Sequence, residues 1–371
     1  MVNLEQLLQE LVEKNGSDLH LKLGRPPVLR IRGDLVPMDN EQLKTEDIQQ
    51  SVYSVTTPEQ QKKLTEEREL DFSFAVKTLS ARFRGNAFYQ RGVLGAVFRV
   101  IPAKIPTLDD LKFPPVLKDI ASRPQGLVLV SGPTGCGKST TLAAIIEYIN
   151  ENFPKHIITI EDPLEFVHQD KKSIINQREI GIDTYSFAGA LKRALRQDPD
   201  IILVGEMRDQ ETISIAVTAA ETGHLVLSTL HTNDAKQAID RVIDTFPPEG
   251  QHQIRMQLAN TLLAVIAQRL LKRADGKGRI ATLEIMINSP TIKKLIEENK
   301  TTAINKAMEE SVTFYQMQTF NQALFKLWKE NLITQEDALA ASPNPNDLKI
   351  QFETTTFGQT SAPPTPSSKR A

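Results

Sequence analysis

The strongest constraint on the fold is a glycine-rich segment that matches the pattern G-x-x-x-x-G-K-[ST]. An apolar run at 127–130 precedes it, and a helical pattern of apolar residues begins near its lysine. Because glycine has no Cβ, the backbone N–H groups of such a turn can point together at an anion. This strand, loop and helix predict a nucleoside triphosphate site made of Gly132, Pro133, Thr134, Gly135, Cys136, Gly137, Lys138, Ser139 and Thr140.

The same loop predicts a metal ion beside the nucleotide. The Lys138 ammonium supplies a positive charge to the β- and γ-phosphates, and the Ser139 hydroxyl can bind Mg²⁺. The N-terminus of the following helix adds its partial positive charge. We therefore expect ATP and Mg²⁺ as cofactors, with Ser139 as a metal ligand.

Composition narrows the class of protein. The chain has 371 residues, 40% of them hydrophobic and 24% charged, which suits two or three globular domains. A net charge of -2 gives no bulk attraction for nucleic acid, so no nucleic-acid partner is expected. Cys136 is the single cysteine, which excludes an intrachain disulfide and a cysteine-cluster zinc site.

No segment predicts export or membrane insertion. Residues 1–14 carry glutamates and helically spaced leucines, unlike a secretory signal. The most apolar stretch, 262–271, is shorter than the roughly 20 residues that span a bilayer, and Gln268 and Arg269 interrupt it. We therefore expect a cytoplasmic protein.

The first hundred residues predict a small α/β domain, PAS-like, with an antiparallel sheet. A turn at Gly33-Asp34 follows the second strand, and a connector with two prolines, 101–106, ends the domain 1–100. Strands are expected at 19–23, 28–32, 70–76, 81–89 and 94–101, and helices at 45–55 and 58–67.

The next part of the chain, 107–341, predicts a RecA-like ATPase domain with a doubly wound parallel sheet and a helical C-terminal part. Short apolar strands at 127–130, 157–160, 201–204 and 225–227 alternate with helical patterns. The chain is expected to be mostly helical after Gln251. The remainder, 342–371, is rich in proline, serine and threonine and is expected to be a tail, largely disordered at its end.

Hydrolysis needs carboxylates beside the phosphates, and two segments provide them. Glu161-Asp162-Pro163-Leu164-Glu165 directly follows the strand at 157–160. The apolar strand 201–204 leads to Glu206, as in a Walker B strand with Glu206 on the metal side. An ordinary turn after a strand also explains each segment, but the phosphate loop favours the catalytic interpretation.

Two histidines flank the strand at 225–227. His231 follows the strand, where it can sense the γ-phosphate or hold the catalytic acid. His224 precedes the strand and is interpreted as structural.

Three arginines on strands of the N-terminal domain alternate with apolar residues and so point away from its core. They are either solvated surface charges or arginine fingers that reach the nucleotide of a neighbouring subunit. These residues are Arg82, Arg84 and Arg99.

Four ordered segments together resemble the bacterial secretion ATPase family, which includes the motors of type IV pili. The likeness also covers GSDLHL at 16–21, RFRGNAFYQRG at 82–92, and QMQTFNQAL and ITQEDAL near the end, so it spans nearly the whole chain. Within the family it is greatest to the pilus retraction motors. The four segments are GPTGCGKST at 132–140, ITIEDPLEF at 158–166, DPDIILVGEMRD at 198–209 and AETGHLVLSTLHTNDA at 220–235.

The resemblance implies a homohexameric ring that hydrolyses ATP to retract type IV pili and so drives twitching motility. It implies an inner-membrane platform protein as partner, pilin indirectly, an accessory retraction ATPase, and a peripheral position at the inner face of the inner membrane. By position it assigns Glu165 as catalytic base, Glu206 as Walker B acid and metal ligand, His231 as His-box residue, and Arg82, Arg84 or Arg99 as inter-subunit charges.

Two positions depart from the family pattern. Cys136 stands where the family usually has serine, and because this position works through its N–H, ATPase activity should survive while a thiol reagent should block ATP binding. The segment 291–298 keeps only Leu295 and Ile296 of the retraction motif and lacks its arginines. That segment is linked in the family to retraction and not to hydrolysis.

Other functions fit the sequence less well. An assembly or type II secretion ATPase usually has a longer N-terminal extension and a four-cysteine metal motif, whereas an accessory retraction ATPase shares the whole architecture. A nucleic-acid translocase needs a basic, aromatic channel, and this chain has 6% aromatic residues. A nucleotide-binding ring without turnover is disfavoured by the presence of both Glu165 and Glu206.

Overall fold

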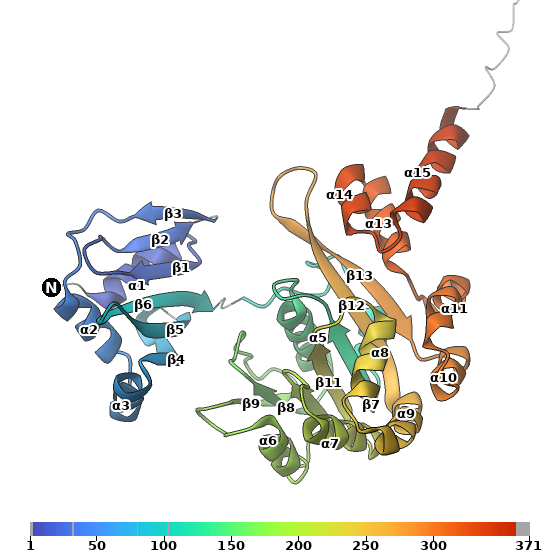
Figure 1. The fold of residues 1–371 in the computed structure, drawn as a ribbon, viewed down its shortest axis with the longest axis horizontal. Helices are drawn as coiled ribbons and strands as arrows, with labels where there is room; N and C mark the ends of the chain where they lie inside the picture. The colour runs from blue at the N-terminus through green and yellow to red at the C-terminus, as the bar shows by residue number, and fades with distance from the viewer. Residues whose placement is uncertain (1–2, 32, 80, 102–103, 361–371) are drawn as a thin grey trace, which may run out of the picture. The chain divides into compact units, whose positions relative to one another are not determined.

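The computed structural model describes residues 3–31, 33–79, 81–101 and 104–360. The chain divides into two compact units: Met1–Ile105 with Glu165–Val167, and Pro106–Leu164 with His168–Ala371. Figure 1 labels the helices and strands of both units. Residues 102–103 of the expected connector and residues 361–371 of the expected tail lie outside the described residues.

The N-terminal unit is built on an antiparallel sheet with the strand order β3-β2-β1-β6-β5-β4. The expected strands form, and β3 is an addition that the sequence did not signal, because all four of its residues are exposed. The elements are α1 (Leu4–Glu13), β1 (Asp18–Leu21), β2 (Val28–Ile31), β3 (Asp34–Pro37), α2 (Thr45–Tyr53), α3 (Pro58–Glu67), β4 (Glu69–Val76), η1 (Lys77–Leu79), β5 (Ala81–Gln90) and β6 (Val93–Ile101).

One face of this sheet forms the core of the N-terminal unit. Phe83 and Phe98 are fully buried there with the leucines of α1. Side chains alternate between the two faces of a strand, so Arg82 and Arg84, the neighbours of Phe83, lie on the opposite face. Arg84 is directly opposite Arg99 of β6 in the sheet register, which places the three arginines on one surface.

The second unit contains a sheet with the order β13-β12-β7-β11-β10-β8-β9. All neighbouring pairs are parallel except β12 and β13. The elements up to β13 are α4 (Val116–Ala121), β7 (Gly126–Ser131), α5 (Lys138–Asn152), β8 (His156–Glu161), β9 (Ile174–Glu179), α6 (Phe187–Ala194), β10 (Ile201–Val204), α7 (Gln210–Glu221), β11 (Leu225–Leu230), α8 (Ala235–Asp244), α9 (Pro248–Thr261), β12 (Leu262–Lys272) and β13 (Arg279–Ile287).

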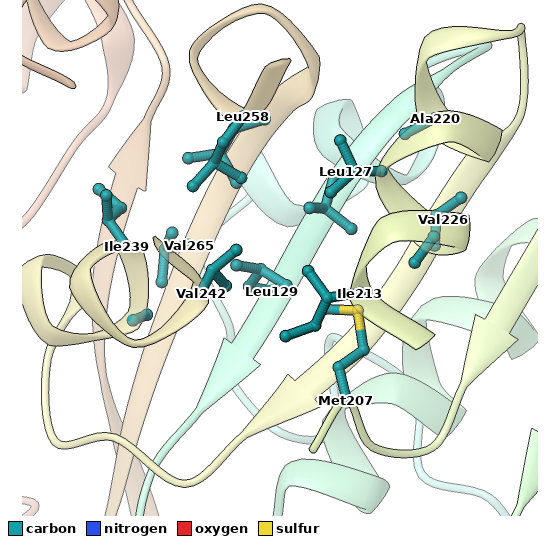
Figure 2. Close-up of a cluster of buried hydrophobic side chains, with 14 of the residues drawn as sticks. Leu127, Leu129, Met207, Ile213, Ala220, Val226, Ile239, Val242, Leu258 and Val265 are labelled. Atoms are coloured by element: carbon teal, nitrogen blue, oxygen red, sulfur yellow. The ribbon is translucent and has the colours of Figure 1, made fainter. Parts of the chain in front are cut away.

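Helices cover both faces of this sheet, and alternate strand residues enter two separate cores. Leu127 and Leu129 of β7 pack with residues of α6 to α9, whereas Val128 and Val130 pack with α4 and α5. Figure 2 shows part of the first core, where Leu127 and Leu129 share a cluster with Ile213 of α7. The doubly wound RecA-like sheet predicted from the apolar runs is confirmed.

The described chain after Gln251 is mostly helical, as expected, but it also contains two long strands that the sequence did not signal. Strands β12 and β13 pair antiparallel from Ala264↔Ile287 to Lys272↔Arg279, forming a long hairpin at one edge of the sheet (Figure 1). The first half of β12 is buried on both faces, so its residues show no alternation that separates a strand from a helix. Strand β9 was also missed, because it is a partly exposed edge strand.

The boundary expected at residue 342 differs from the structure. Helix α15 occupies part of the predicted tail, and its Leu348 and Phe352 are buried with Phe320 and Leu324 of α13. Apolar residues spaced by four form one face of α15, within a segment whose overall composition suggested disorder. The remaining elements are α10 (Pro290–Glu297), η2 (Thr301–Ala303), α11 (Ile304–Glu310), α12 (Val312–Tyr315), α13 (Phe320–Lys329), α14 (Gln335–Ala341) and α15 (Pro345–Thr360).

Truncating Phe352 should loosen this C-terminal cluster. The ring centroid of Phe352 lies 4.4 Å from that of Trp328, the single tryptophan, so Trp328 fluorescence reports local unfolding. We expect Phe352→Ala to lower the free energy of unfolding in urea by about 3–5 kcal/mol. The control is Ile350→Ala, at a position 58% exposed on the same helix. It should change the free energy of unfolding by less than about 0.5 kcal/mol. Equal effects of the two variants would contradict the burial of Phe352.

Candidate active site

The phosphate loop joins β7 to α5 through three glycines with left-handed backbone angles. The φ angles are 147° at Gly132, 78° at Gly135 and 95° at Gly137. Side chains with a Cβ adopt such angles rarely, which is the physical reason for glycine at these positions. The loop thereby gains the curvature needed to present several N–H groups to one anion.

The Lys138 side chain lies against the loop itself. Its Nζ donates to the Gly132 carbonyl at 2.8 Å and to the Pro133 carbonyl at 3.3 Å, and the residue is only 9% exposed. Lys138 also begins α5, so the ammonium group and the positive end of the helix dipole occupy the same place. The site is therefore strongly electropositive before any other residue contributes.

The sheet topology brings the other candidate residues to the same edge as the loop. β7, β11, β10 and β8 are adjacent and parallel, so their carboxyl ends share one edge. The loop follows β7, His231 follows β11, Glu206 follows β10, and Glu161 ends β8. In open α/β sheets ligands bind at this edge.

Glu206 and His231 are in direct contact. The His231 Nε2 atom lies 3.3 Å from Glu206 Oε1, and Arg208 Nη2 lies 2.7 Å from Glu206 Oε2. The Glu206 side chain is 19% exposed, and those of His231 and Arg208 are 45% and 76% exposed. Both carboxylate oxygens of Glu206 thus lie within 3.3 Å of a basic side chain that remains partly open to solvent. The sequence did not single out Arg208.

The acidic segment 161–165, which follows β8, is divided between the two units. Thr159 Oγ1 donates to Glu161 Oε1 at 2.6 Å, so the first carboxylate of this segment is held within its own strand. Glu165 is exposed, and the short segment Glu165–Val167 belongs to the N-terminal unit. The ATP-binding unit by itself therefore brings together the loop, Glu206 and His231, but not Glu165.

The three arginines lie on the N-terminal unit, each with a polar partner there. Arg82 Nη2 donates to Ser73 Oγ at 2.9 Å, and Arg84 Nη2 lies 3.6 Å from Asp71 Oδ1. Arg99 Nε donates to the buried carboxylate of Asp18 at 2.7 Å. Arg99 is thus the arginine with the clearest structural role within its own unit.

His224 has the structural environment that the sequence suggested. Its Nδ1 atom lies 2.9 Å from the Ala219 carbonyl, at the end of α7. The ring therefore satisfies a helix-terminal backbone group and lies at the opposite end of β11 from the loop.

A partly buried ionic cluster that sequence reasoning missed joins α5 to the segment after residue 167. His168 Nδ1 is 3.0 Å from Glu147 Oε2 of α5, and Lys171 Nζ is 2.5 Å from Glu147 Oε1. Burial acts to raise the pKa of Glu147, but hydrogen bonds from Lys171 and His168 outweigh it and lower that pKa. Burial also lowers the pKa of His168. The cluster fastens the segment that begins directly after Glu165–Val167 to the helix that begins at the phosphate loop.

Glu284 of β13 is a second buried carboxyl that no motif signalled. It is 2% exposed and accepts from the Ala235 N–H at the start of α8 at 2.9 Å. Burial raises its pKa to about 7, although backbone N–H groups of Ala235 and Phe320 act in the opposite direction. Glu284 thereby anchors the start of α8, three residues after His231–Thr232, to the β12–β13 hairpin.

The Cys136 thiol is buried under the phosphate loop. It is 3% exposed, and burial raises its pKa above the ordinary cysteine value despite the nearby Lys138. This burial argues against the expected sensitivity to thiol reagents, because alkylation needs an accessible thiolate. The sequence revealed the position of Cys136 in the motif but not the direction of its side chain.

Within 3–31, 33–79, 81–101 and 104–360, no group of three or more His, Cys, Asp or Glu residues is arranged to hold a metal ion. Of the helices in these ranges, none is both long and apolar enough to cross a membrane.

Fold and site together define the class of protein: a phosphate-loop ATPase built on a RecA-like sheet. The chain belongs to the Type II/IV secretion system protein family, whose model matches residues 2–338.

Individual relatives resemble the chain over most of its length. It is 46% identical over 347 residues to the type IV pilus retraction ATPase PilT of Pseudomonas aeruginosa, which covers 94% of this chain and 100% of PilT. It is 44% identical over 352 residues to the type IV pilus ATPase PilU of the same organism, with 95% and 92% covered. A crystal structure of the pilus retraction motor PilT with bound ADP has a TM-score of 0.89 at 47% identity, covering 94% of this chain and 100% of that one.

The burial of Cys136 predicts slow alkylation. We expect iodoacetamide at pH 8 to modify the native protein at least about 10-fold more slowly than the urea-unfolded protein, as mass spectrometry would measure. Since Cys136 is the single cysteine, the adduct needs no assignment. Comparable rates in the two states would show that the thiol is accessible.

Proposed function

We propose that this chain is an ATP-hydrolysing motor that retracts type IV pili. One observation carries the proposal: the phosphate loop, Glu206 and His231 lie at one sheet edge. The similarity of the chain to PilT over nearly the full length of both supports the choice of pilus retraction. The working motor is a homohexamer. A platform protein holds it peripherally at the inner face of the inner membrane, and through this protein the motor acts on pilin.

Charge at the loop explains how ATP is held. When ATP binds, Lys138 exchanges its carbonyl partners at Gly132 and Pro133 for phosphate oxygens, because bonds between two charged groups are stronger. The Ser139 hydroxyl and the Glu206 carboxylate are oxygen donors of the kind that Mg²⁺ prefers. Mg²⁺ bound there would neutralise charge on the β- and γ-phosphates.

Glu206 and His231 form the part of the site that responds to the γ-phosphate. His231 Nε2 lies 3.3 Å from Glu206 Oε1 and holds the carboxylate in place. Because the histidine side chain is half exposed, it can also contact the terminal phosphate. Arg208, which lies on the other oxygen of Glu206, limits the rotation of the acid.

Glu165 acts as the general base in this proposal, and arginines of the N-terminal unit act on a neighbouring subunit. A phosphoryl transfer step needs an oriented water molecule and added positive charge at the transition state. Glu165 is exposed, and Arg82 and Arg84 lie on one open sheet face, so these groups are available to a site that is completed when subunits assemble.

Replacing the base should separate ATP binding from turnover. We expect Glu165→Gln to bind ATP with unchanged affinity but to release phosphate about 10² times more slowly or worse. Lys138→Ala should abolish hydrolysis by weakening ATP binding itself. Glu249→Gln, an exposed glutamate on α9, is the control and should keep wild-type turnover. Full turnover by Glu165→Gln would remove this residue from the mechanism.

Mixed rings test whether the arginines act between subunits. Arg82→Ala and Lys138→Ala subunits should each be inactive alone, and mixing them should recover part of the ATPase activity through interfaces that hold both wild-type groups. Mixing Lys138→Ala with Glu206→Gln, which lie in the same unit, should give no recovery. Arg84→Ala and Arg99→Gln extend the test, with glutamine chosen because the buried Asp18 carboxylate would otherwise lose its partner. No recovery with any of the three arginines would refute the idea.

Counting pili tests the biological output. Deleting the gene should leave cells with excess pili that do not retract, whereas bald cells would indicate an assembly ATPase. A chain with Lys138→Ala should fail to restore retraction.

The resemblance to PilU favours an accessory retraction ATPase as the second candidate. The segment of α10, which lacks the arginines of the retraction motif, points the same way. To separate the two, the chain is expressed alone in cells without other retraction ATPases. Retraction in those cells supports the principal motor, and retraction only beside a second ATPase supports the accessory role.

A further inference from the structure

Gln268 on β12 bridges the phosphate loop and the first turn of α5. Its side chain is 2% exposed, and its Nε2 donates to the Cys136 carbonyl at 2.6 Å. Its Oε1 accepts from Thr141 Oγ1, also at 2.6 Å. One buried carboxamide thus holds both the loop and the helix that binds the phosphates.

The loop glycines also pack against Gln268. A Cβ on Gly132 would lie 2.4 Å from the Gln268 carbonyl oxygen, and one on Gly137 would lie 2.9 Å from Gln268 Nε2. No side chain can replace glycine at Gly132 without moving the β12 backbone. Gly132 and Gly137 are therefore required by their positive φ angles and, independently, by the closeness of Gln268.

We propose that Gln268 is a positioning residue that orients the Cys136–Gly137 peptide for phosphate binding. In a trans peptide the C=O and N–H groups point in opposite directions. With the Cys136 carbonyl fixed towards Gln268, the Gly137 N–H faces away from β12, which in a phosphate loop is the phosphate side. Loss of the carboxamide frees this peptide to rotate and withdraws one donor from the bound nucleotide.

A purely structural role predicts a different outcome, and the chain offers variants that separate the two. Removing Gln268 leaves the Thr141 hydroxyl and the Cys136 carbonyl without this partner, which costs stability. Thr141 Oγ1 also donates to the Gly137 carbonyl at 3.2 Å, so it keeps one partner when Gln268 is removed. Removing the hydroxyl as well, in Gln268→Met with Thr141→Val, eliminates one of the two groups that lose the Gln268 contact and restores part of the stability. It cannot restore the orientation of the Cys136–Gly137 peptide.

The experiment measures kcat, KM for MgATP and the thermal midpoint of the full chain. We expect Gln268→Met to lower kcat/KM by about 10- to 100-fold, Thr141→Val alone to change it less than about threefold, and the double variant to regain stability but not kcat/KM. Recovery of both quantities in the double variant would reduce Gln268 to a structural role. A wild-type kcat/KM in Gln268→Met would also reduce Gln268 to a structural role.

If Gln268→Met does not fold, Gln268→Asn takes its place, because its shorter carboxamide cannot reach both partners. A folded Gln268→Asn with wild-type kcat/KM would overturn the proposal, and a loss of about 10-fold or more would support it. The inference rests on ATP turnover by the wild-type protein. An inactive wild type contradicts the proposed function, whereas an active wild type with equally active variants contradicts this inference alone.

Discussion

The parallel register of β7, β11, β10 and β8 is the constraint on which the rest of the structure depends. Each of these strands is apolar on both faces and is buried between two helical layers. Because they run in the same direction, the polar residues after their last apolar positions must all emerge at one edge. The phosphate loop, His231, Glu206 and Glu161 are separated along the chain but meet there for this reason.

Positive and negative side chains lie close together at this sheet edge. Lys138 and the start of α5 form a positive region, and Glu206 is a negative charge at the same sheet edge. His231 and Arg208 hold that carboxylate from two sides. Glu165 and the arginines lie on the N-terminal unit, so the ATP-binding unit alone lacks the proposed general base and the proposed inter-subunit arginines.

The β12–β13 hairpin gives the phosphate loop a physical connection to the C-terminal helices. Gln268 contacts the loop, and the next residue, Arg269, donates to the Ala341 carbonyl and lies 4.4 Å from the Phe320 ring centroid. Adjacent residues of a strand point to opposite faces, so the hairpin contacts ATP-binding groups on one side and α13 and α14 on the other. One strand therefore contacts both the phosphate loop and the C-terminal cluster.

The sequence alone determined the four central strands of the second sheet, the loop and the candidate residues, because apolar runs, glycines and acids at strand ends are local signals. It did not determine the β12–β13 hairpin, since a segment buried on both faces has no periodicity, or the packing of α15, whose two apolar anchors lie in a polar segment. Only the tertiary structure shows that Cys136 is buried, that His231 contacts Glu206, and that Gln268 donates a hydrogen bond to the loop. Each of these contacts links residues on different strands or helices, and their distances depend on packing that no local pattern records.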